Sequence, residues 1–261
     1  MPNPEEHDYE QVNKVNSLFE EALKSQVISD LKNGLSFQEI LDNQQIEKPL
    51  EQAEEVECCD GRCPHKKGSY KAIAGAGILL SKEELNDYIK SNPGMKYLKA
   101  HEGCGAGKIA FEKAKSAGTL PEGIFTAEQY VEWWTKTTAA EYNLEYKYTP
   151  AKDFQDSEMN HHEAGLMINF DPALIKGMPN VFVSHSAECL NDDYVKNEIS
   201  ILTGIAFSDH GFGNRLSQEN PFYIFICAKN EAEKEHLSAL AKEAVASYGD
   251  KVVIESAVSP F

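Results

Sequence analysis

Two short strings of this chain bring together side chains that bind transition metals. Residues 58–62 read Cys-Cys-Asp-Gly-Arg, the pattern C-x-D-x-R, and residues 101–105 read His-Glu-Gly-Cys-Gly, the pattern H-x-x-C-G. Cys58, His101 and Cys104 together supply two thiolates and one imidazole. Three such ligands leave one position of a tetrahedral zinc-type site open, which a catalytic metal needs and a structural metal lacks. The sequence therefore predicts a catalytic metal centre.

An acid and a base lie beside the first predicted ligand. Asp60 and Arg62 follow Cys58 at alternating positions, so on an extended segment their side chains point to the same side as the ligand. The carboxylate of Asp60 can accept a hydrogen bond from water on the metal, and the guanidinium of Arg62 keeps that carboxylate ionised and oriented. We therefore expect Asp60 and Arg62 to be catalytic residues.

The ordered pair of motifs resembles the metal centre of beta-class carbonic anhydrases. The wording Cys-x-Asp-Gly-Arg, with Gly-Cys-Gly running into a lysine-bearing helix, is similar to the related zeta class, which accepts cadmium or zinc. The close match spans roughly residues 56–115. The resemblance implies that Cys58, His101 and Cys104 bind the metal, that Asp60 orients a hydroxide on it, and that Arg62 pairs with Asp60. It leaves the choice between the beta and zeta classes open.

The activity implied by this resemblance is the reversible hydration of CO2 to bicarbonate. Zn²⁺, or Cd²⁺ in its place, lowers the pKa of bound water towards about 7, and the metal-bound hydroxide attacks CO2. The same hydroxide could attack CS2 or COS, which makes a hydrolase the nearest alternative. In some beta-type proteins the aspartate replaces the water on the metal and closes the site. The sequence leaves this possibility open for Asp60.

Other cysteines and histidines allow different interpretations. Cys58 or Cys59 could join Cys63, His65 and Cys104 in a closed structural zinc site, and the chain would then be a non-catalytic interaction protein. A second metal site or a proton shuttle is conceivable at a further group of residues, although loop histidines held by hydrogen bonds are the simpler interpretation. This group is His161, His162, His185 and His210, with Asp209 as a carboxylate partner. We expect Cys189 and Cys227 to be buried as small apolar side chains.

Hydrophobic periodicity and capping signals indicate the elements that position these residues. Helices are expected over 8–43, 105–116, 191–202 and 231–247. Capping signals at Ser36, Ser81 and Thr126 each mark the start of a helix. Strands are expected over 71–80, 95–100, 166–170, 181–184, 222–227 and 251–257. This alternation predicts an α/β fold with a largely parallel sheet flanked by helices, in which the ends of strands carry the site. The glycines at 75, 77, 103, 105 and 107 are expected to let backbone approach the ion or its substrate.

Composition limits the partners. The net charge of −17 argues against nucleic acid and anionic membranes, because a phosphate surface would repel the chain. Six cysteines, three of them within 58–63, do not form a disulfide framework, and no signal peptide or membrane-length apolar run is present. We therefore expect a cytoplasmic protein acting on a small molecule. The proposed division is an N-terminal helical arm, 1–50, and an α/β domain, 51–261. The arm either packs on a neighbouring subunit, as in beta-type homo-oligomers, or covers its own domain.

Overall fold

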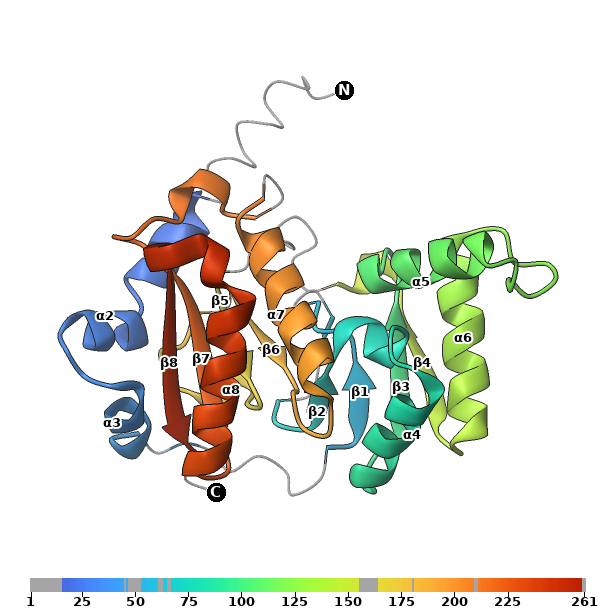
Figure 1. Ribbon diagram of the computed structural model, residues 1–261, viewed down its shortest axis with the longest axis horizontal. Coiled ribbons are helices and arrows are strands. Elements are labelled where there is room, and N and C mark those ends of the chain that lie inside the picture. The colour runs from blue at the N-terminus through green and yellow to red at the C-terminus, as the bar shows by residue number, and fades with distance from the viewer. Residues whose placement is uncertain are drawn as a thin grey trace. The chain divides into compact units, whose positions relative to one another are not determined.

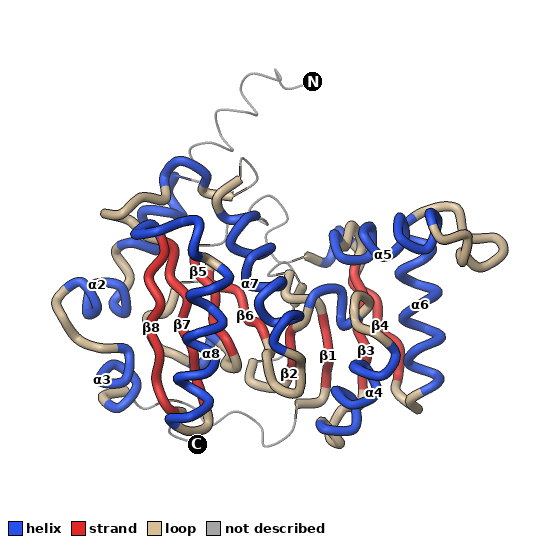
Figure 2. The backbone as a smooth tube through the Cα atoms, viewed as in Figure 1, coloured by secondary structure: helices blue, strands red, loops and turns tan. Residues whose placement is uncertain are grey.

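A computed structural model describes residues 16–44, 46, 53–60, 63–64, 67–154, 164–179, 181–208 and 211–259. The protein is α/β, as predicted, with two four-stranded parallel sheets flanked by helices (Figures 1 and 2). The chain forms two compact units. The β1–β4 unit consists of residues 49–157 and 185–191, and the β5–β8 unit consists of the rest.

The β1–β4 unit alternates strands with helices. Its elements are β1 (Glu55–Glu57), β2 (Tyr70–Ala72), the 3₁₀ turn η1 (Ala74–Gly77), α4 (Lys82–Ser91), β3 (Tyr97–His101), α5 (Gly105–Ser116), α6 (Ala127–Glu141), β4 (Glu145–Thr149) and the 3₁₀ turn η2 (Ala151–Asp153).

The β5–β8 unit also contains the described N-terminal helices. Residues 16–23 are helical, and the part of the predicted 8–43 helix before residue 16 lies outside the described residues. The other elements are α2 (Gln26–Lys32), α3 (Phe37–Asp42), β5 (Gly165–Ile168), η3 (Pro172–Leu174), β6 (Phe182–His185), α7 (Asp192–Ala206), η4 (Gly213–Arg215), β7 (Phe222–Ala228), α8 (Glu231–Ala244), η5 (Ala246–Lys251) and β8 (Val252–Val258).

Capping residues set the helix starts where the sequence predicts them. Ser36, Ser81 and Thr126 each cap a helix through a reciprocal capping box. Each box satisfies backbone N–H groups that the first turn of a helix leaves without partners. These three caps confirm the corresponding sequence predictions.

The predicted strand over 71–80 is wrong beyond Ala72. Strand β2 ends at Ala72, and the chain then turns through η1. Gly75 and Ala76 adopt φ values of 57° and 56°, and Gly77 has a φ of 92°. These left-handed conformations are open to glycine and break a strand. The apolar run is therefore a tight turn against the sheet, and not an extended buried strand.

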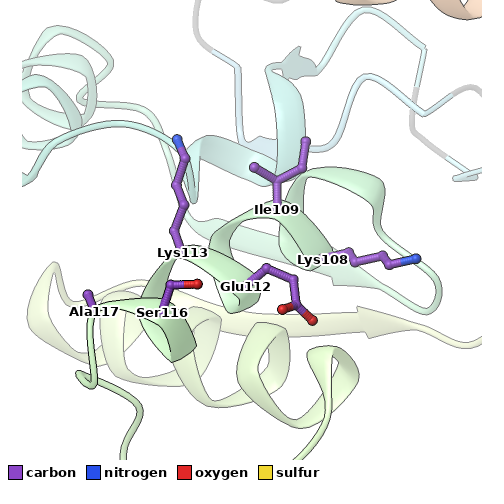
Figure 3. Close-up of a pocket in the computed structure, with 6 residues that line it drawn as sticks. All are labelled: Lys108, Ile109, Glu112, Lys113, Ser116 and Ala117. Carbon is purple, nitrogen blue, oxygen red and sulfur yellow. The ribbon is translucent and has the colours of Figure 1, made fainter.

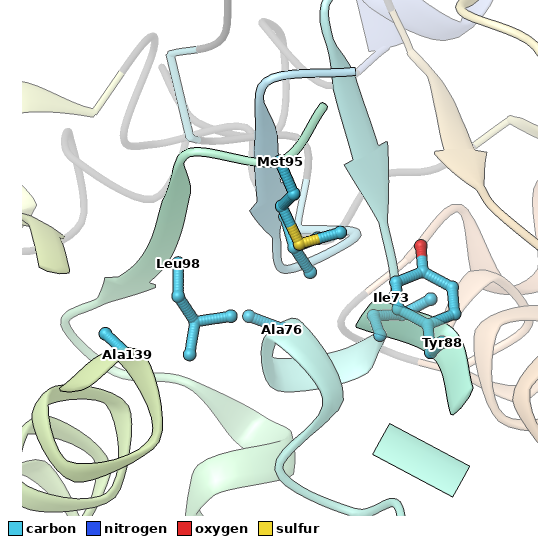
Figure 4. Close-up of a cluster of buried hydrophobic side chains, with 7 residues drawn as sticks. Ile73, Ala76, Tyr88, Met95, Leu98 and Ala139 are labelled. Carbon is cyan, nitrogen blue, oxygen red and sulfur yellow. The ribbon is translucent and has the colours of Figure 1, made fainter. Parts of the chain in front are cut away.

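Alternation along β1 and β3 gives the first sheet two different faces. Val56 and Leu98 point to an apolar face that α4 and α6 cover through Tyr88 and Ala139, in the buried cluster drawn in Figure 4. Burying a leucine-sized side chain stabilises a fold by about 2 kcal/mol. The opposite face carries charged residues at the intervening positions, including Glu57 of β1. This division explains why the short string Glu-Val-Glu forms a strand although only one of its residues is apolar.

Both sheets follow the same order of strands. The first is β2-β1-β3-β4 and the second is β6-β5-β7-β8, so in each the second strand lies outside the first and the third lies on its other side. The chain therefore reverses its direction across each sheet between the first and third strands. In open α/β sheets, ligands bind at the carboxyl ends of the strands at such a reversal point. None of the helices in the described residues is long and apolar enough to cross a membrane.

Candidate metal centre

The three predicted ligands lie at the reversal point of the first sheet. Cys58 directly follows β1, His101 is the last residue of β3, and Cys104 is the N-cap of α5. Strands β1 and β3 are parallel neighbours, so their carboxyl ends meet at one edge of the sheet. The fold thus brings together residues that the sequence keeps far apart.

The geometry of these three side chains is that of a metal site. The Sγ atoms of Cys58 and Cys104 and a ring nitrogen of His101 all lie within 4.8 Å of one another. All three residues are buried, with exposed fractions of 8%, 6% and 2%. Within the part of the chain that the structure describes, no other group of three such residues meets this condition. The Cys-His-Cys group could therefore hold a metal ion.

The imidazole of His101 is oriented for coordination through Nε2. Its Nδ1 lies 2.9 Å from the carbonyl oxygen of Glu102, and a carbonyl only accepts, so Nδ1 carries the proton of this hydrogen bond. Nε2 is buried and forms no hydrogen bond with any described residue. Fixing one ring nitrogen on a backbone carbonyl is the usual way to direct the other at a metal.

Both sulfur atoms accept hydrogen bonds from backbone amides. Gly75 donates to Cys58 Sγ at 3.2 Å, and Gly107 donates to Cys104 Sγ at 3.4 Å within the first turn of α5. Amide donors and a helix N-terminus stabilise the thiolate form, which is the form that binds metals. A Cβ on Gly75 would come within 2.6 Å of Ile78 Cγ2 and 3.5 Å of Cys104 Sγ. Only glycine fits this place.

The ionisation of the three groups is linked. A hydrogen bond from the Cys104 thiol, and a further one from Cys59, lower the pKa of Cys58 well below its ordinary value. The same contact with Cys58, together with burial, raises the pKa of Cys104 well above its ordinary value. Burial lowers the pKa of His101, but the negative charge of Cys58 and then of Asp60 outweigh burial and raise it to about 9. The site thus holds one thiolate readily, and a second thiolate needs a cation beside it.

Asp60 lies next to the three ligands without joining them. Its Oδ2 atom is 3.8 Å from His101 Nε2, and its side chain is 10% exposed, so it reaches water at the rim of the cluster. It does not belong to the group whose ligand atoms all lie within 4.8 Å of one another. This placement fits a residue that orients a water beside the ion. Arg62, its predicted partner, lies outside the described residues.

The glycines around the ligands serve the site in different ways. Gly75 and Gly107 each donate a backbone N–H to a ligand sulfur, as the predicted close approach of backbone requires. Gly107 also packs against α6, where a Cβ would lie 2.0 Å from Val131 Cγ2, so it allows the two helices to approach. Gly103 has a φ of 68°, which the turn between β3 and α5 requires, and a Cβ there would meet no atom within 4 Å.

The alternative ligands do not assemble in the described residues. Cys59 and Cys63 are buried near Cys58, but neither joins the Cys-His-Cys group. His65, His161, His162, Asp209 and His210 lie outside the described residues. His185 is fully buried at the end of β6. Cys227 is buried as predicted, whereas Cys189 is exposed, so that part of the prediction is wrong.

A surface depression lies on α5, away from the ligands. It is lined by Lys108, Ile109, Glu112, Lys113, Ser116 and Ala117, all from this one helix (Figure 3). None of the predicted site residues lines it. It is therefore an exposed helix face and not the mouth of the metal centre.

Sequence patterns do not show the residues that support the ligands. The amide of Gly75, the carbonyl of Glu102 and the charged pair of Glu57 with Lys99 all contact or adjoin the centre. Backbone groups have no sequence signature, although the alternation of Glu57 with Val56 is a signal of a charged sheet face. Comparison with protein-family models, curated proteins and solved structures finds no match for this chain.

Proposed function

We propose that this protein is a metal-dependent lyase that hydrates CO2 reversibly to bicarbonate, in the manner of carbonic anhydrases. The observation that carries the proposal is the buried cluster of two sulfurs and one imidazole nitrogen within 4.8 Å, with a carboxylate beside it and outside it. Three ligands leave one position of a tetrahedral ion for a reacting molecule.

The donor set suits a borderline or soft divalent cation. Two thiolates and one imidazole favour Zn²⁺, and Cd²⁺ is compatible with the same sulfur-rich set. When bound, such an ion supplies Lewis acidity that brings the pKa of a water towards neutrality and so makes hydroxide available. The ion would be held by Nε2 of His101, which forms no hydrogen bond with a described residue, and by the two sulfurs of Cys58 and Cys104, which accept hydrogen bonds from backbone amides.

The residues of the chain then perform the remaining steps. The carboxylate of Asp60 accepts a hydrogen bond from the attacking oxygen, which leaves a lone pair of that oxygen directed at the carbon of CO2. Because Asp60 is partly exposed, it also contacts the solvent to which the proton is finally released. Burial of the three ligands keeps bulk water away from their donor atoms. Orientation of the attacking oxygen by Asp60 is important, because two thiolate ligands reduce the Lewis acidity of an ion.

The test is stopped-flow CO2 hydration by protein of measured metal content. Asp60→Asn should retain about one ion per chain and lose at least about 100-fold in kcat/KM, because an amide positions the attacking oxygen less well and cannot take its proton. Asp87→Asn, a change at an exposed carboxylate of α4, is the matched control and should behave as wild type. Full turnover in Asp60→Asn would refute the mechanism.

The same samples separate the proposal from its alternatives. Metal at one per chain with no CO2 hydration in the wild type would overturn the proposed activity. Turnover of COS or CS2 by that protein would then identify a hydrolase. Inactivity towards all three substrates, with full occupancy, would identify a structural ion, as in a closed site.

A further inference from the structure

We propose that Lys99 is a positioning residue of the metal centre, because its ammonium group contacts the side chain of the residue before the ligand Cys58 and the backbone after Asp60. This inference rests on the metal site of the proposed function and does not depend on the identity of the substrate. Lys99 lies on β3, two residues before His101, on the charged face of the sheet. It is therefore attached to the strand that carries the imidazole ligand.

The contacts of Lys99 bracket the first ligand. Its Nζ lies 2.8 Å from Glu57 Oε2, and Glu57 immediately precedes Cys58. The same Nζ donates a hydrogen bond to the carbonyl oxygen of Pro64, which follows the turn closed by the hydrogen bond from Cys63 N to Asp60 O. A second carboxylate, Glu55 Oε2, lies at 3.9 Å. One ammonium group thus joins β3 to the chain before Cys58 and to the chain after Asp60.

The burial of this pair argues for a positional role. The side chains of Lys99 and Glu57 are 8% and 1% exposed. A buried ion pair loses much of its attraction to desolvation, and two apolar side chains of similar volume often stabilise a fold as well or better. What apolar side chains cannot do is donate a hydrogen bond to Pro64.

Strand pairing alone does not fix this part of the chain. The described register of β1 with β3 pairs Glu55 with Tyr97 and Val56 with Leu98, and Cys58 follows the last residue of β1. Beyond β1 the Cys58 and Asp60 side chains depend on contacts other than strand pairing for their distance from His101. Lys99 supplies such contacts from the strand of His101 itself. Loss of these contacts should let Cys58 and Asp60 drift from the imidazole.

The experiment compares Lys99→Met with the double variant Glu57→Gln/Lys99→Met. The single change removes the cation that lies 2.8 Å from the buried Glu57 carboxylate and could unfold the unit, whereas the double change replaces both side chains by neutral ones of similar volume. The matched control is Lys96→Met, which breaks the pair of Lys96 with Glu54 just before strands β3 and β1, where the lysine side chain is 59% exposed. Circular dichroism first establishes that each variant is folded.

Three readouts then report the position of Cys58. In competition with a chromophoric chelator, the folded double variant should bind Zn²⁺ about 10- to 100-fold more weakly than wild type, the range for residues that orient metal ligands. The thiolate-to-Co²⁺ charge-transfer band of the Co²⁺-loaded protein should shift or lose intensity. In the apoprotein, the peptide that contains Cys58 should be alkylated faster than in wild type or Lys96→Met. A merely structural role would move none of these readouts in a folded variant.

The outcomes separate this inference from the proposed function. If wild type binds Zn²⁺ and the double variant matches it in affinity, Co²⁺ spectrum and Cys58 alkylation, Lys99 does not position the ligand and this inference is wrong. If wild type itself binds neither Zn²⁺ nor Co²⁺, the proposed function and this inference fall together.

Discussion

The number of protons on the three ligands follows from the hydrogen bonds and charges around each one. Nδ1 of His101 keeps its proton on the Glu102 carbonyl, so any second proton on the ring resides at Nε2, the atom that would coordinate an ion. The negative charge of Cys58 raises the pKa of His101 to about 9 although burial opposes it, and Cys104 also keeps its proton because its pKa is raised. Cys58 loses its proton more readily than an ordinary thiol, because hydrogen bonds from Cys104 and Cys59 lower its pKa well below the ordinary value.

Metal binding should therefore release protons. Near pH 7.5, loading Zn²⁺ should displace about two protons per ion, one from His101 Nε2 and one from Cys104, because ligands must be deprotonated. The apparent affinity should rise with pH up to about 9, where the His101 proton is lost without the metal, and should rise less steeply above it. Titration calorimetry in buffers of different ionisation enthalpy measures this number. A release near zero at pH 7.5 would show that the ligands are already deprotonated.

At the scale of elements, the contact of α5 with α6 sets the position of Cys104. Gly107 lies in the first turn of α5, three residues after Cys104, and donates its amide to the sulfur of that ligand. A Cβ at Gly107 would lie 2.0 Å from Val131 Cγ2 on α6, too close for both helices to stay in place. The close approach of the two helices is thus a requirement of the ligand's position.

Gly107→Ala should separate the two helices and weaken the site. We expect a loss of about 1–3 kcal/mol in the free energy of unfolding, the usual range for overpacking, together with weaker Zn²⁺ binding. The double variant Gly107→Ala/Val131→Ala should recover much of both, because it removes the atom that clashes. Gly105→Ala is the control, since a Cβ there meets no atom within 4 Å. Urea unfolding and chelator competition provide the measurements, and a full loss in the double variant would contradict this explanation.

Local signals in the sequence predict the helices better than the strands. The helix of Gly105–Ser116 has the predicted bounds, because its cap and its apolar spacing are both local. The strand Glu145–Thr149 was not predicted, since its residues are mostly half-buried or exposed and no continuous apolar run marks it. The stretch after Ala72 was predicted as a strand because its residues are apolar. Left-handed backbone at Gly75 and Ala76 depends on packing that composition does not reveal.

The ligands could be identified from residue types and spacing, whereas their support could not. Cys58, His101 and Cys104 stand out because few side chains bind transition metals, and the structure places them together. The amide of Gly75 and the ammonium of Lys99 act across the sheet, and their contacts depend on which strands are neighbours. Strand order is a property of the whole unit, so no local pattern predicts it.

At the scale of the whole molecule, both sheets have the same strand order, whereas the described Cys-His-Cys group belongs to one of them. Each unit has a parallel sheet with its strands in the order second, first, third, fourth. Where Cys58 follows β1, Asn169 follows β5, and where Cys104 caps α5, Asn230 caps α8. The sequence shows no internal repeat, so the repetition is visible only in the fold. Among the described residues, the β5–β8 unit has no group that could hold a metal.

Removal of the ion should therefore destabilise one unit directly. Both tryptophans of the chain, Trp133 and Trp134, lie on α6, so their fluorescence reports the β1–β4 unit, while circular dichroism reports both units. At a free Zn²⁺ concentration 1,000 times the dissociation constant, the ion should add about 4 kcal/mol to the stability of that unit. Chelation should lower the urea midpoint seen by fluorescence and leave part of the dichroism transition unchanged. Equal shifts by both probes would show that the two units unfold as one.

The separation of Cys58 from His101 and Cys104 along the chain sets the order of sheet formation and metal binding. In a small zinc finger the ligands lie close in sequence, and the peptide can fold around its ion. Here the imidazole of His101 reaches Cys58 only after β3 has paired with β1. In the sequence, β2 and α4 lie between these two strands. Such non-local pairing is slow, because closing a long loop costs conformational entropy before any stabilising contact forms. An ion at this site would therefore bind after the sheet has formed, and would not nucleate it.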